Sequence, residues 1–243
     1  MAAEEHFSAT SVTQLSNRTS ILWISKIGSI SVFCVNHDTG MIHWLHMTVL
    51  TSMGGATVDQ SRSANMADIW FISDTHFYHE NIIQYCGRPF KDAEFMNEFM
   101  IEEWNKVVKP QDHVWHLGDV AMGFGGNQGK ITNLLSRLNG KKRACVGNHD
   151  PIKAQWFQQG FEKIELWRGF KDEGFTCVHI PLQIDQLRDG HVCVHGHIHN
   201  NLVTDKFGKP DPRYICVCVE HTNYAPVNID VIKEKVNKVR IGG

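Results

Sequence analysis

Five short groups of Asp, Asn and His residues follow one another between residues 74 and 199. Imidazole nitrogens and carboxylate or amide oxygens are ligands of divalent transition metals. Because none of the groups contributes sulfur, the set suits Mn²⁺, Fe, Ni²⁺, Co²⁺ or Zn²⁺ and not a structural zinc site built from cysteines. The five groups are Asp74-Thr75-His76, Gly118-Asp119, Gly147-Asn148-His149-Asp150, His179 and Gly196-His197-Ile198-His199.

The spacing inside these motifs lets neighbouring side chains reach one ion. Asp74 and His76 are two residues apart at the end of an expected strand, so their side chains point to the same side. His197 and His199 repeat that spacing. Asp119 has two carboxylate oxygens and can bridge two cations, and the glycine before it allows a sharp turn. The motifs therefore predict two sets of ligands that share one carboxylate.

Each motif has a simpler explanation when it is taken alone. Asp-x-His and Gly-Asp are common in turns, Gly147 and Asn148 are turn residues, and an isolated His179 is by default a buried histidine with a satisfied ring. Their joint occurrence by chance, in this order and each after an expected strand, is very small. The carboxyl ends of strands are also where open α/β sheets place their ligand sites.

The segments that precede the motifs have the pattern of short buried strands. Strands are expected over residues 68–73, 113–117, 143–146, 175–180, 191–195 and 214–219. Helical spacing of apolar residues predicts helices over residues 92–109, 130–138 and 228–239. Strands that alternate with helices and then dominate predict an α/β fold, a four-layer α/β/β/α sandwich of two mixed β-sheets flanked by helices. The metal site is expected at the carboxyl ends of the strands.

The order D-x-H, G-D, G-N-H-D, H and G-H-x-H resembles the pattern of the calcineurin-like metallophosphoesterase superfamily over residues 66–243, and residues 71–79 look like a compact bacterial or phage-type branch. The resemblance implies dimetal-dependent hydrolysis of phosphoester bonds by a metal-bridging hydroxide, with Mn²⁺ as the expected metal. It implies that one metal is held by Asp74, His76, Asp119 and His199. It implies that the other is held by Asp119, Asn148, His179 and His197.

The resemblance also implies that His149 is the catalytic histidine and that Asp150 is its partner. Two further residues, His79 and Arg88, are candidates for binding the substrate. A cap on a helix is the competing interpretation for the stretch that contains His79. A solvated loop arginine is the competing interpretation for Arg88.

The expected substrate is a small phosphoester or nucleotide, because residues 66–243 hold the two sheets and leave no cap or long groove for a folded protein. We therefore expect a phosphodiesterase or nucleotide phosphohydrolase. A phosphomonoesterase, including a phosphoprotein phosphatase, is the alternative within enzymes. A non-catalytic binding module of the same fold would be expected to lose ligands, and none of the motif residues is missing.

Residues 1–65 differ in composition from the rest of the chain and are rich in Ser, Thr and Asn. No apolar run among them reaches the roughly 18 residues that a membrane helix needs, and the acidic start argues against a secretory signal. Met66 leads directly into an expected strand, like the start of a protein. We expect residues 1–65 to be a non-catalytic, poorly ordered extension, with a small strand-rich accessory segment as the alternative, and residues 66–243 to be the catalytic domain.

The overall composition limits the partners. A net charge of −2 gives no electrostatic indication of a nucleic-acid or membrane partner, and no series of aromatic residues favours a nuclease, although nucleic acid remains an open alternative. Seven cysteines without a CxxC pair favour a reducing compartment, so we expect a cytoplasmic protein. The sequence does not indicate the oligomeric state.

Overall fold

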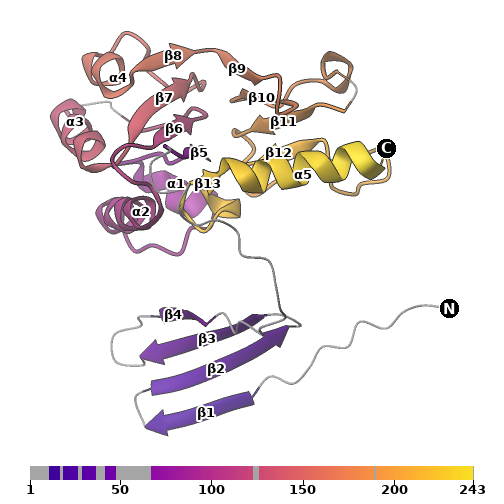
Figure 1. Cartoon of the computed structure of the whole chain (residues 1–243). Helices are drawn as coiled ribbons and strands as arrows, with labels where there is room; N and C mark the ends of the chain where they lie inside the picture. The colour runs from indigo at the N-terminus through magenta and orange to yellow at the C-terminus, as the bar shows by residue number, and fades with distance from the viewer. Residues whose placement is uncertain are drawn as a thin grey trace. The chain divides into compact units, whose positions relative to one another are not determined.

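The computed structural model describes residues 11–16, 19–26, 29–36, 42–47, 67–122, 126–188 and 190–242. The chain divides into two compact units, Met1–Ala64 and Asn65–Gly243. In the first unit four strands pair in chain order as an antiparallel sheet (Figure 1). They are β1 (Ser11–Ser16), β2 (Thr19–Lys26), β3 (Ser29–Asn36) and β4 (Ile42–Met47). The expectation that residues 1–65 are poorly ordered and non-catalytic stays a prediction. Of these residues, 1–10 and 48–65 lie outside the described part of the structure.

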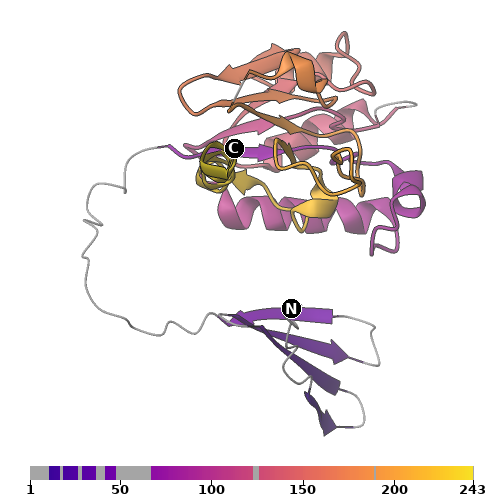
Figure 2. The same ribbon diagram turned by 90° about the vertical axis from the view of Figure 1, so that its right-hand side faces the viewer.

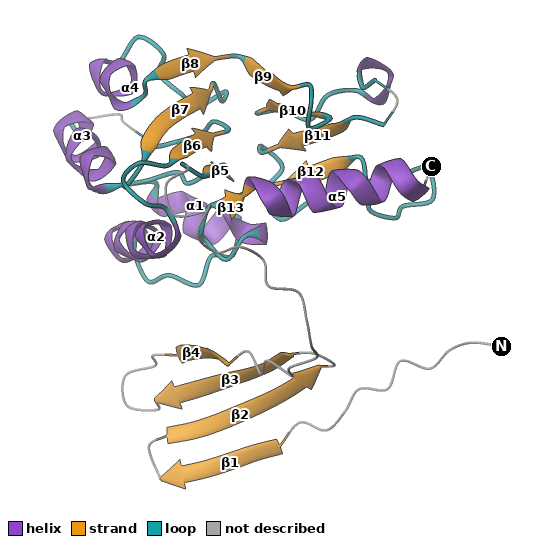
Figure 3. Ribbon diagram, in the orientation of Figure 1, coloured by secondary structure: helices purple, strands orange, loops and turns teal. Residues whose placement is uncertain are grey.

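The second unit contains two mixed sheets, which Figure 3 shows facing each other. The first has the order β13-β5-β6-β7-β8, in which β13 is antiparallel to β5 and the others are parallel. Its strands are β5 (Ile69–Ile72), β6 (His113–His116), β7 (Lys141–Cys145), β8 (Lys163–Glu165) and β13 (Val227–Asn228).

The second sheet of this unit has the order β12-β11-β10-β9, in which only β9 is antiparallel to its neighbour. Its strands are β9 (Trp167–Phe170), β10 (Phe175–Val178), β11 (Val192–His195) and β12 (Tyr214–Cys216). Of its parallel part, the central strand β11 is buried along its whole length, whereas β10 and β12 alternate buried and half-buried residues.

Five α-helices accompany the sheets: α1 (Glu80–Tyr85), α2 (Ala93–Val107), α3 (Gln128–Arg137), α4 (Gln155–Gly160) and α5 (Ile229–Gly242). The Asp92 carboxylate accepts a hydrogen bond from the Phe95 N–H and so caps the start of α2. Figure 2 shows α5 end-on where α2 lies across the view, so the axes of these two helices cross. Among the described residues, no helix combines the length and the apolar composition that crossing a membrane requires.

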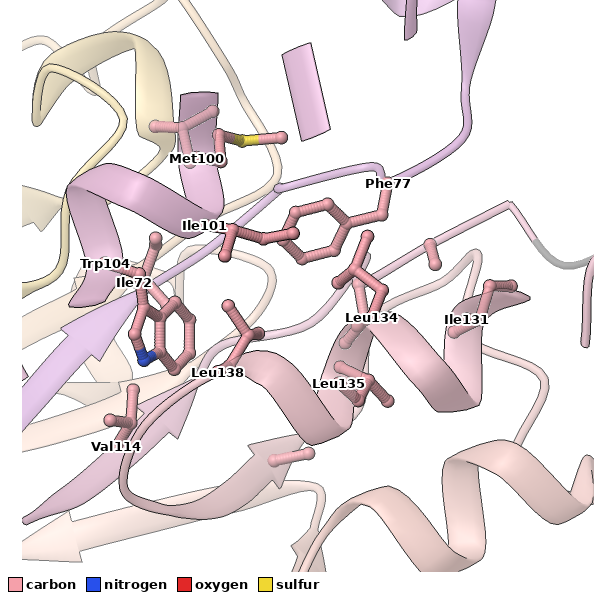
Figure 4. Packing of buried hydrophobic residues seen from close by; sticks show 14 of the residues in the cluster. Ile72, Phe77, Met100, Ile101, Trp104, Val114, Ile131, Leu134, Leu135 and Leu138 are labelled. Carbon is pink, nitrogen blue, oxygen red and sulfur yellow. The ribbon is translucent and has the colours of Figure 1, made fainter. Parts of the chain in front are cut away.

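Alternation along the strands divides the core in two. On β5, Ile72 packs in the cluster beneath the helices, together with Trp104 of α2 and Leu134 of α3 (Figure 4). Its neighbour Phe71 points the other way, into the cluster between the sheets, where Phe175 lies. Each fully buried side chain of this size contributes roughly 1.5–3 kcal/mol of transfer free energy. Both faces of the first sheet are therefore packed against apolar clusters at β5, and the polar motif residues follow where its strands end.

The predicted architecture of two mixed sheets flanked by helices is confirmed. The strand expected over residues 214–219 ends earlier, at Cys216, and the chain then turns into a short 3₁₀ helix, η2 (Val219–His221). In the second unit, the elements that sequence patterns did not predict are all short: α1, α4, β8, β9, β13 and the 3₁₀ helices η1 (Ile184–Gln186) and η2. A segment of two to six residues is too short to show a period.

Candidate metal centre

The five motifs lie on the loops that leave the carboxyl ends of β5, β6, β7, β10 and β11. Backbone hydrogen bonds hold the first two loops together. The Asp74 N–H donates to the Gly118 carbonyl at 3.0 Å, and the His76 N–H donates to the Asp119 carbonyl at 3.1 Å. The positions of these side chains are therefore set by paired main chain.

The two sheets meet beside Asp74. Ser73 forms an isolated parallel bridge with Cys218, and its N–H donates to the Val217 carbonyl at 2.9 Å. This contact brings the end of β5 next to the chain that continues from β12. The Cys218 thiol and the His197 N–H both donate to Asp74 Oδ2, at 3.2 and 2.9 Å. One oxygen of Asp74 is thus fully used, which leaves Oδ1 for another partner.

Most of the predicted ligands have a left-handed backbone. The φ angles are 59° at Asp74, 47° at His76, 56° at Asp119, 73° at His197 and 49° at His199. Such values are uncommon outside glycine and cost on the order of 1–3 kcal/mol each. They persist only where the surroundings fix them, and they gather at functional sites. Their concentration here supports a functional role for this edge of the sheets.

Two glycines let the motif loops approach the carboxylates. A Cβ atom at Gly196 would collide with Ser73 Oγ and Asp74 Oδ2. A Cβ atom at Gly147 would collide with the Asp119 side chain and main chain. Any larger residue at either position would therefore push a loop away from the carboxylates that it surrounds.

The first group of candidate ligands is Asp74, His76 and His199. Asp74 Oδ1 lies 4.0 Å from His76 Nε2 and 3.8 Å from His199 Nε2. Burial raises the pKa of the Asp74 carboxyl and lowers the pKa of His76 to about 2. Asp74 Oδ1 and His76 Nε2 are buried and have no hydrogen-bond partner among the residues that the structure describes. Such atoms are costly in a protein interior unless a partner, here a cation, satisfies them.

The second group is Asp119, Asn148, His179 and His197. His179 Nε2 lies 3.4 Å from Asp119 Oδ2, 2.9 Å from Asn148 Oδ1 and 3.2 Å from His197 Nδ1. His179 Nδ1 donates to the Leu117 carbonyl at 2.8 Å, which fixes the ring and directs Nε2 toward the group. The four polar atoms of this group therefore converge on one region.

Asp119 lies between the two groups. Its Oδ2 is 3.6 Å from His76 Nε2 in the first group and 3.4 Å from His179 Nε2 in the second. Its Oδ1 accepts the His149 N–H at 2.9 Å. Although burial alone would raise the pKa of the Asp119 carboxyl, the contact with His179 holds it below its usual range. An ionised carboxylate in this position is suited to bridge two cations.

The separations fit metal ligation. Oxygen and nitrogen ligands bind such ions at about 2.0–2.2 Å, so two ligands of one ion lie no more than about 4.4 Å apart. The contacts given above for each group, from 2.9 to 4.0 Å, satisfy this limit. Both groups also combine imidazole with carboxylate, and neither contains a thiolate. The residues present therefore fit two divalent ions.

His149 and Asp150 face different partners. His149 is exposed, and its ring centroid is 5.7 Å from that of His76. The buried Asp150 carboxylate accepts three backbone N–H groups, from Asp119 at 3.0 Å, Val120 at 2.9 Å and Gly147 at 2.8 Å. This differs from the expected pairing of Asp150 with the His149 ring. Asp150 instead joins two motif loops, because three nearby N–H groups need an acceptor.

A pocket of about 670 Å³ opens beside the two groups. Its lining includes His149 and His79 together with His76, His197 and His199. His79 Nδ1 lies 3.4 Å from His76 Nδ1, and its ring is half-buried at the pocket wall. His79 is therefore placed where a substrate-binding residue would have to be, and that role stays a prediction.

A sequence model of calcineurin-like phosphoesterases matches residues 67–229. The chain belongs to this family. Members of the family typically bind two divalent metal ions and hydrolyse phosphoesters, which agrees with the two groups of candidate ligands described above. The resemblance drawn from the five motifs is confirmed.

Several proteins resemble this phosphoesterase. The uncharacterised protein MJ1445 of Methanocaldococcus jannaschii is 39% identical over 178 residues, which span 73% of this chain and 96% of MJ1445. The Gene 66 protein of Mycobacterium phage L5 is 27% identical over 172 residues, or 58% of this chain and 82% of the phage protein. The crystal structure of AQ665 from Aquifex aeolicus, a protein of unknown function, superposes with a TM-score of 0.55 and 27% identity, covering 70% of this chain and 99% of AQ665.

Arg88 has a different position from the one expected of a substrate-binding residue in this phosphoesterase. Its side chain is fully buried. Its nitrogens donate to the carbonyls of Asp74 and Thr75, at 2.7 and 3.0 Å, and to Glu220 Oε1 at 2.7 and 3.0 Å. The fifth N–H donates to Met96 Sδ at 3.4 Å, so the described contacts leave no donor for a phosphate. The prediction that Arg88 binds substrate is therefore wrong, and the guanidinium instead fixes the loop of the first motif.

Glu220 is a site residue that sequence reasoning did not find. Its Oε1 lies 3.0 Å from His199 Nδ1, and since an ionised carboxylate only accepts, the ring nitrogen donates. Burial raises the pKa of Glu220, but the contacts with His199 and Arg88 outweigh it and lower the pKa to about 2. This contact leaves His199 Nε2 free to bind a metal. No local spacing indicates the role, because Glu220 and Arg88 are 132 positions apart.

Proposed function

We propose that this phosphoesterase hydrolyses small phosphodiesters or nucleotides with two divalent metal ions, of which Mn²⁺ is the expected one. The observation that carries the proposal is the convergence of seven side chains in two adjoining groups. The first group also contains two buried atoms, Asp74 Oδ1 and His76 Nε2, for which the described residues offer no hydrogen-bond partner. One ion would be held by Asp74, His76, Asp119 and His199. The other would be held by Asp119, Asn148, His179 and His197.

When bound, the two ions supply positive charge for the phosphoryl oxygens and lower the pKa of water at the site. The chain's own residues supply position and protons. His79 lies at the pocket wall, in reach of a phosphate oxygen held near His76. His149 is exposed in the pocket, so its ring can donate a proton to the leaving oxygen of the ester. Asp150 keeps the loop of His149 against the loop of Asp119.

The proposed substrate is small because the pocket is small. About 670 Å³ is the volume of a pocket for a drug-sized molecule, whereas a folded protein would need an extended surface. We further propose a cytoplasmic location. It is supported by six cysteines of the described residues, Cys86, Cys145, Cys177, Cys193, Cys216 and Cys218, which form no disulfide.

The test is a metal analysis of the purified full chain, followed by two model substrates. Two equivalents of metal are expected after incubation with Mn²⁺. The chain should then hydrolyse bis-p-nitrophenyl phosphate with a higher kcat/KM than p-nitrophenyl phosphate, and EDTA should abolish both activities. A strong preference for the monoester would replace the diesterase proposal with a phosphomonoesterase. Absence of bound metal would overturn the proposal as a whole.

A further inference from the structure

One wall of the pocket beside the candidate metal ligands is apolar, and the proposed hydrolysis does not use it. The wall consists of Ile82, Tyr85, Leu202 and Val203. Tyr85 is 73% exposed and Leu202 is 46% exposed, whereas Ile82 is buried. Large apolar side chains that are left open inside a concave site are typical of ligand pockets.

A hydrogen bond between the end of α1, next to Tyr85, and the loop that carries Leu202 holds this wall in place. The Asn200 side-chain amide donates to the Cys86 carbonyl at 2.7 Å, so the loop after His199 is tied to the end of α1. The Tyr85 ring stands edge-on to His79, with centroids 6.3 Å apart and an angle of 80° between the rings. The aromatic ring therefore has a defined position, adjacent to the histidines that line the other wall.

The charges of the residues that line the pocket determine which kind of phosphoester it can bind. None of the described residues that line it is Lys or Arg, and its polar side-chain groups apart from histidine are all uncharged: the amides of Asn200 and Asn201, the Tyr85 hydroxyl and the Cys86 thiol. A second phosphate or a polyanionic chain would lack a cationic partner there. A neutral, flat group attached to a single phosphate matches both the apolar wall and the amides.

We infer that the wall formed by Tyr85 and Leu202 is a subsite for the base of a nucleoside phosphoester. The base would stack on the exposed Tyr85 ring, while its phosphate lies at the histidines. The inference rests on the proposed function, because the phosphate must bind beside the metal ligands. Stacking of a base on an aromatic side chain contributes roughly 1–3 kcal/mol, which corresponds to about five- to 150-fold in affinity.

The test compares three probes by calorimetric titration of the Mn²⁺-loaded full chain: AMP, ribose 5-phosphate and inorganic phosphate. AMP is expected to bind about tenfold more tightly than ribose 5-phosphate. Tyr85→Ala should remove this difference and leave the affinity for inorganic phosphate unchanged. Tyr85→Phe should keep the difference, because the stacking ring is retained. Phe207→Ala is the matched control, since Phe207 is 75% exposed but does not line the pocket.

The outcomes separate this inference from the proposed function. Equal affinities of the wild-type chain for AMP and ribose 5-phosphate would overturn the base subsite, while phosphate binding and diester hydrolysis would still support the metal centre. The base subsite would also be overturned if Tyr85→Ala and Phe207→Ala changed the affinity for AMP equally. If the loaded chain binds none of the three probes and hydrolyses no diester, the proposed function fails and the subsite fails with it.

Discussion

At the scale of single residues, the division of work between His149 and Asp150 follows from what each side chain touches. Asp150 is buried and accepts three N–H groups of two loops, so its removal would leave those donors without an acceptor. His149 is exposed beside His76 and contributes only its N–H to the Asp119 carboxylate. Its ring can therefore be removed without disturbing the candidate ligands.

We predict that His149→Ala lowers kcat by about 10²-fold or more, the scale of one general acid, and leaves metal content unchanged. The backbone N–H that donates to Asp119 is retained in this variant. Steady-state kinetics with bis-p-nitrophenyl phosphate and elemental analysis of the same sample provide the two measurements. Loss of metal together with activity would show instead that His149 is a ligand.

Glu220 acts on the candidate centre through His199, and this gives a second residue-scale prediction. Removing the charge with Glu220→Gln keeps an oxygen acceptor but weakens the hold on the His199 ring. Changes of such outer partners typically lower metal affinity by about 10- to 100-fold. We therefore expect Glu220→Gln to bind Mn²⁺ about 10- to 100-fold more weakly than the wild-type chain, in a titration of the metal-free protein.

The matched control is Glu98→Gln, which makes the same change in an exposed pair with Arg137. Exposed pairs contribute roughly 0–1 kcal/mol, so Glu98→Gln should have little effect on stability and none on metal affinity. Equal Mn²⁺ affinities for both variants would show that Glu220 has no influence on the metal centre.

At the scale of elements, sequence patterns predicted helices and strands where the periodic pattern was long. They indicated candidate ligands where these residues form short local motifs. The helix expected over residues 92–109 is α2 at Ala93–Val107, and the strand expected over 113–117 is β6 at His113–His116. The candidate ligands could be found because each lies directly after a strand. Arg88 and Glu220 could not be interpreted in this way, because their roles depend on the loop after α1 and the helix η2 being brought together across the fold.

The last residue of β6, His116, makes the stability of the fold sensitive to acid. It is buried, and its Nε2 donates to Thr75 Oγ1 at 2.9 Å, because that hydroxyl donates to the Val120 carbonyl. Its Nδ1 has no hydrogen-bond partner in the described part of the chain. Burial lowers the pKa of His116 to about 3, whereas an unfolded chain has the ordinary value near 6.5. Protons therefore bind the unfolded chain more strongly between these two values.

We predict that the free energy of unfolding is insensitive to His116 above pH 6.5 and falls as the pH drops from 6.5 toward 3. One such histidine contributes about 1.4 kcal/mol per pH unit in this window. His116→Gln keeps a donor for Thr75 and should flatten the dependence by that amount, in denaturant titrations with EDTA between pH 4.5 and 7.5. The exposed His221→Gln is the control, and parallel curves for wild type and His116→Gln would contradict the prediction.

At the scale of the whole molecule, the candidate centre requires both sheets of the second unit. Asp74 and Asp119 follow strands of the first sheet, whereas His179 and His197 follow strands of the second. The bridge between Ser73 and Cys218 joins the two. Because the ligands come from segments more than 100 residues apart, metal binding should stabilise the folded unit and not an isolated sheet.

The first unit contributes none of the residues named in the candidate centre, all of which lie between Asp74 and Glu220. The second unit has its own apolar clusters on both faces of its first sheet, and the family match also lies within it. We therefore predict that a variant lacking residues 2–65 keeps the metal content and the kcat/KM of the full chain within about twofold. A variant that folds, as judged by circular dichroism, and binds metal but has lost turnover would assign the first unit a part in catalysis. A substitution of His149 in both backgrounds provides the control, since it should lower kcat by the same factor in each.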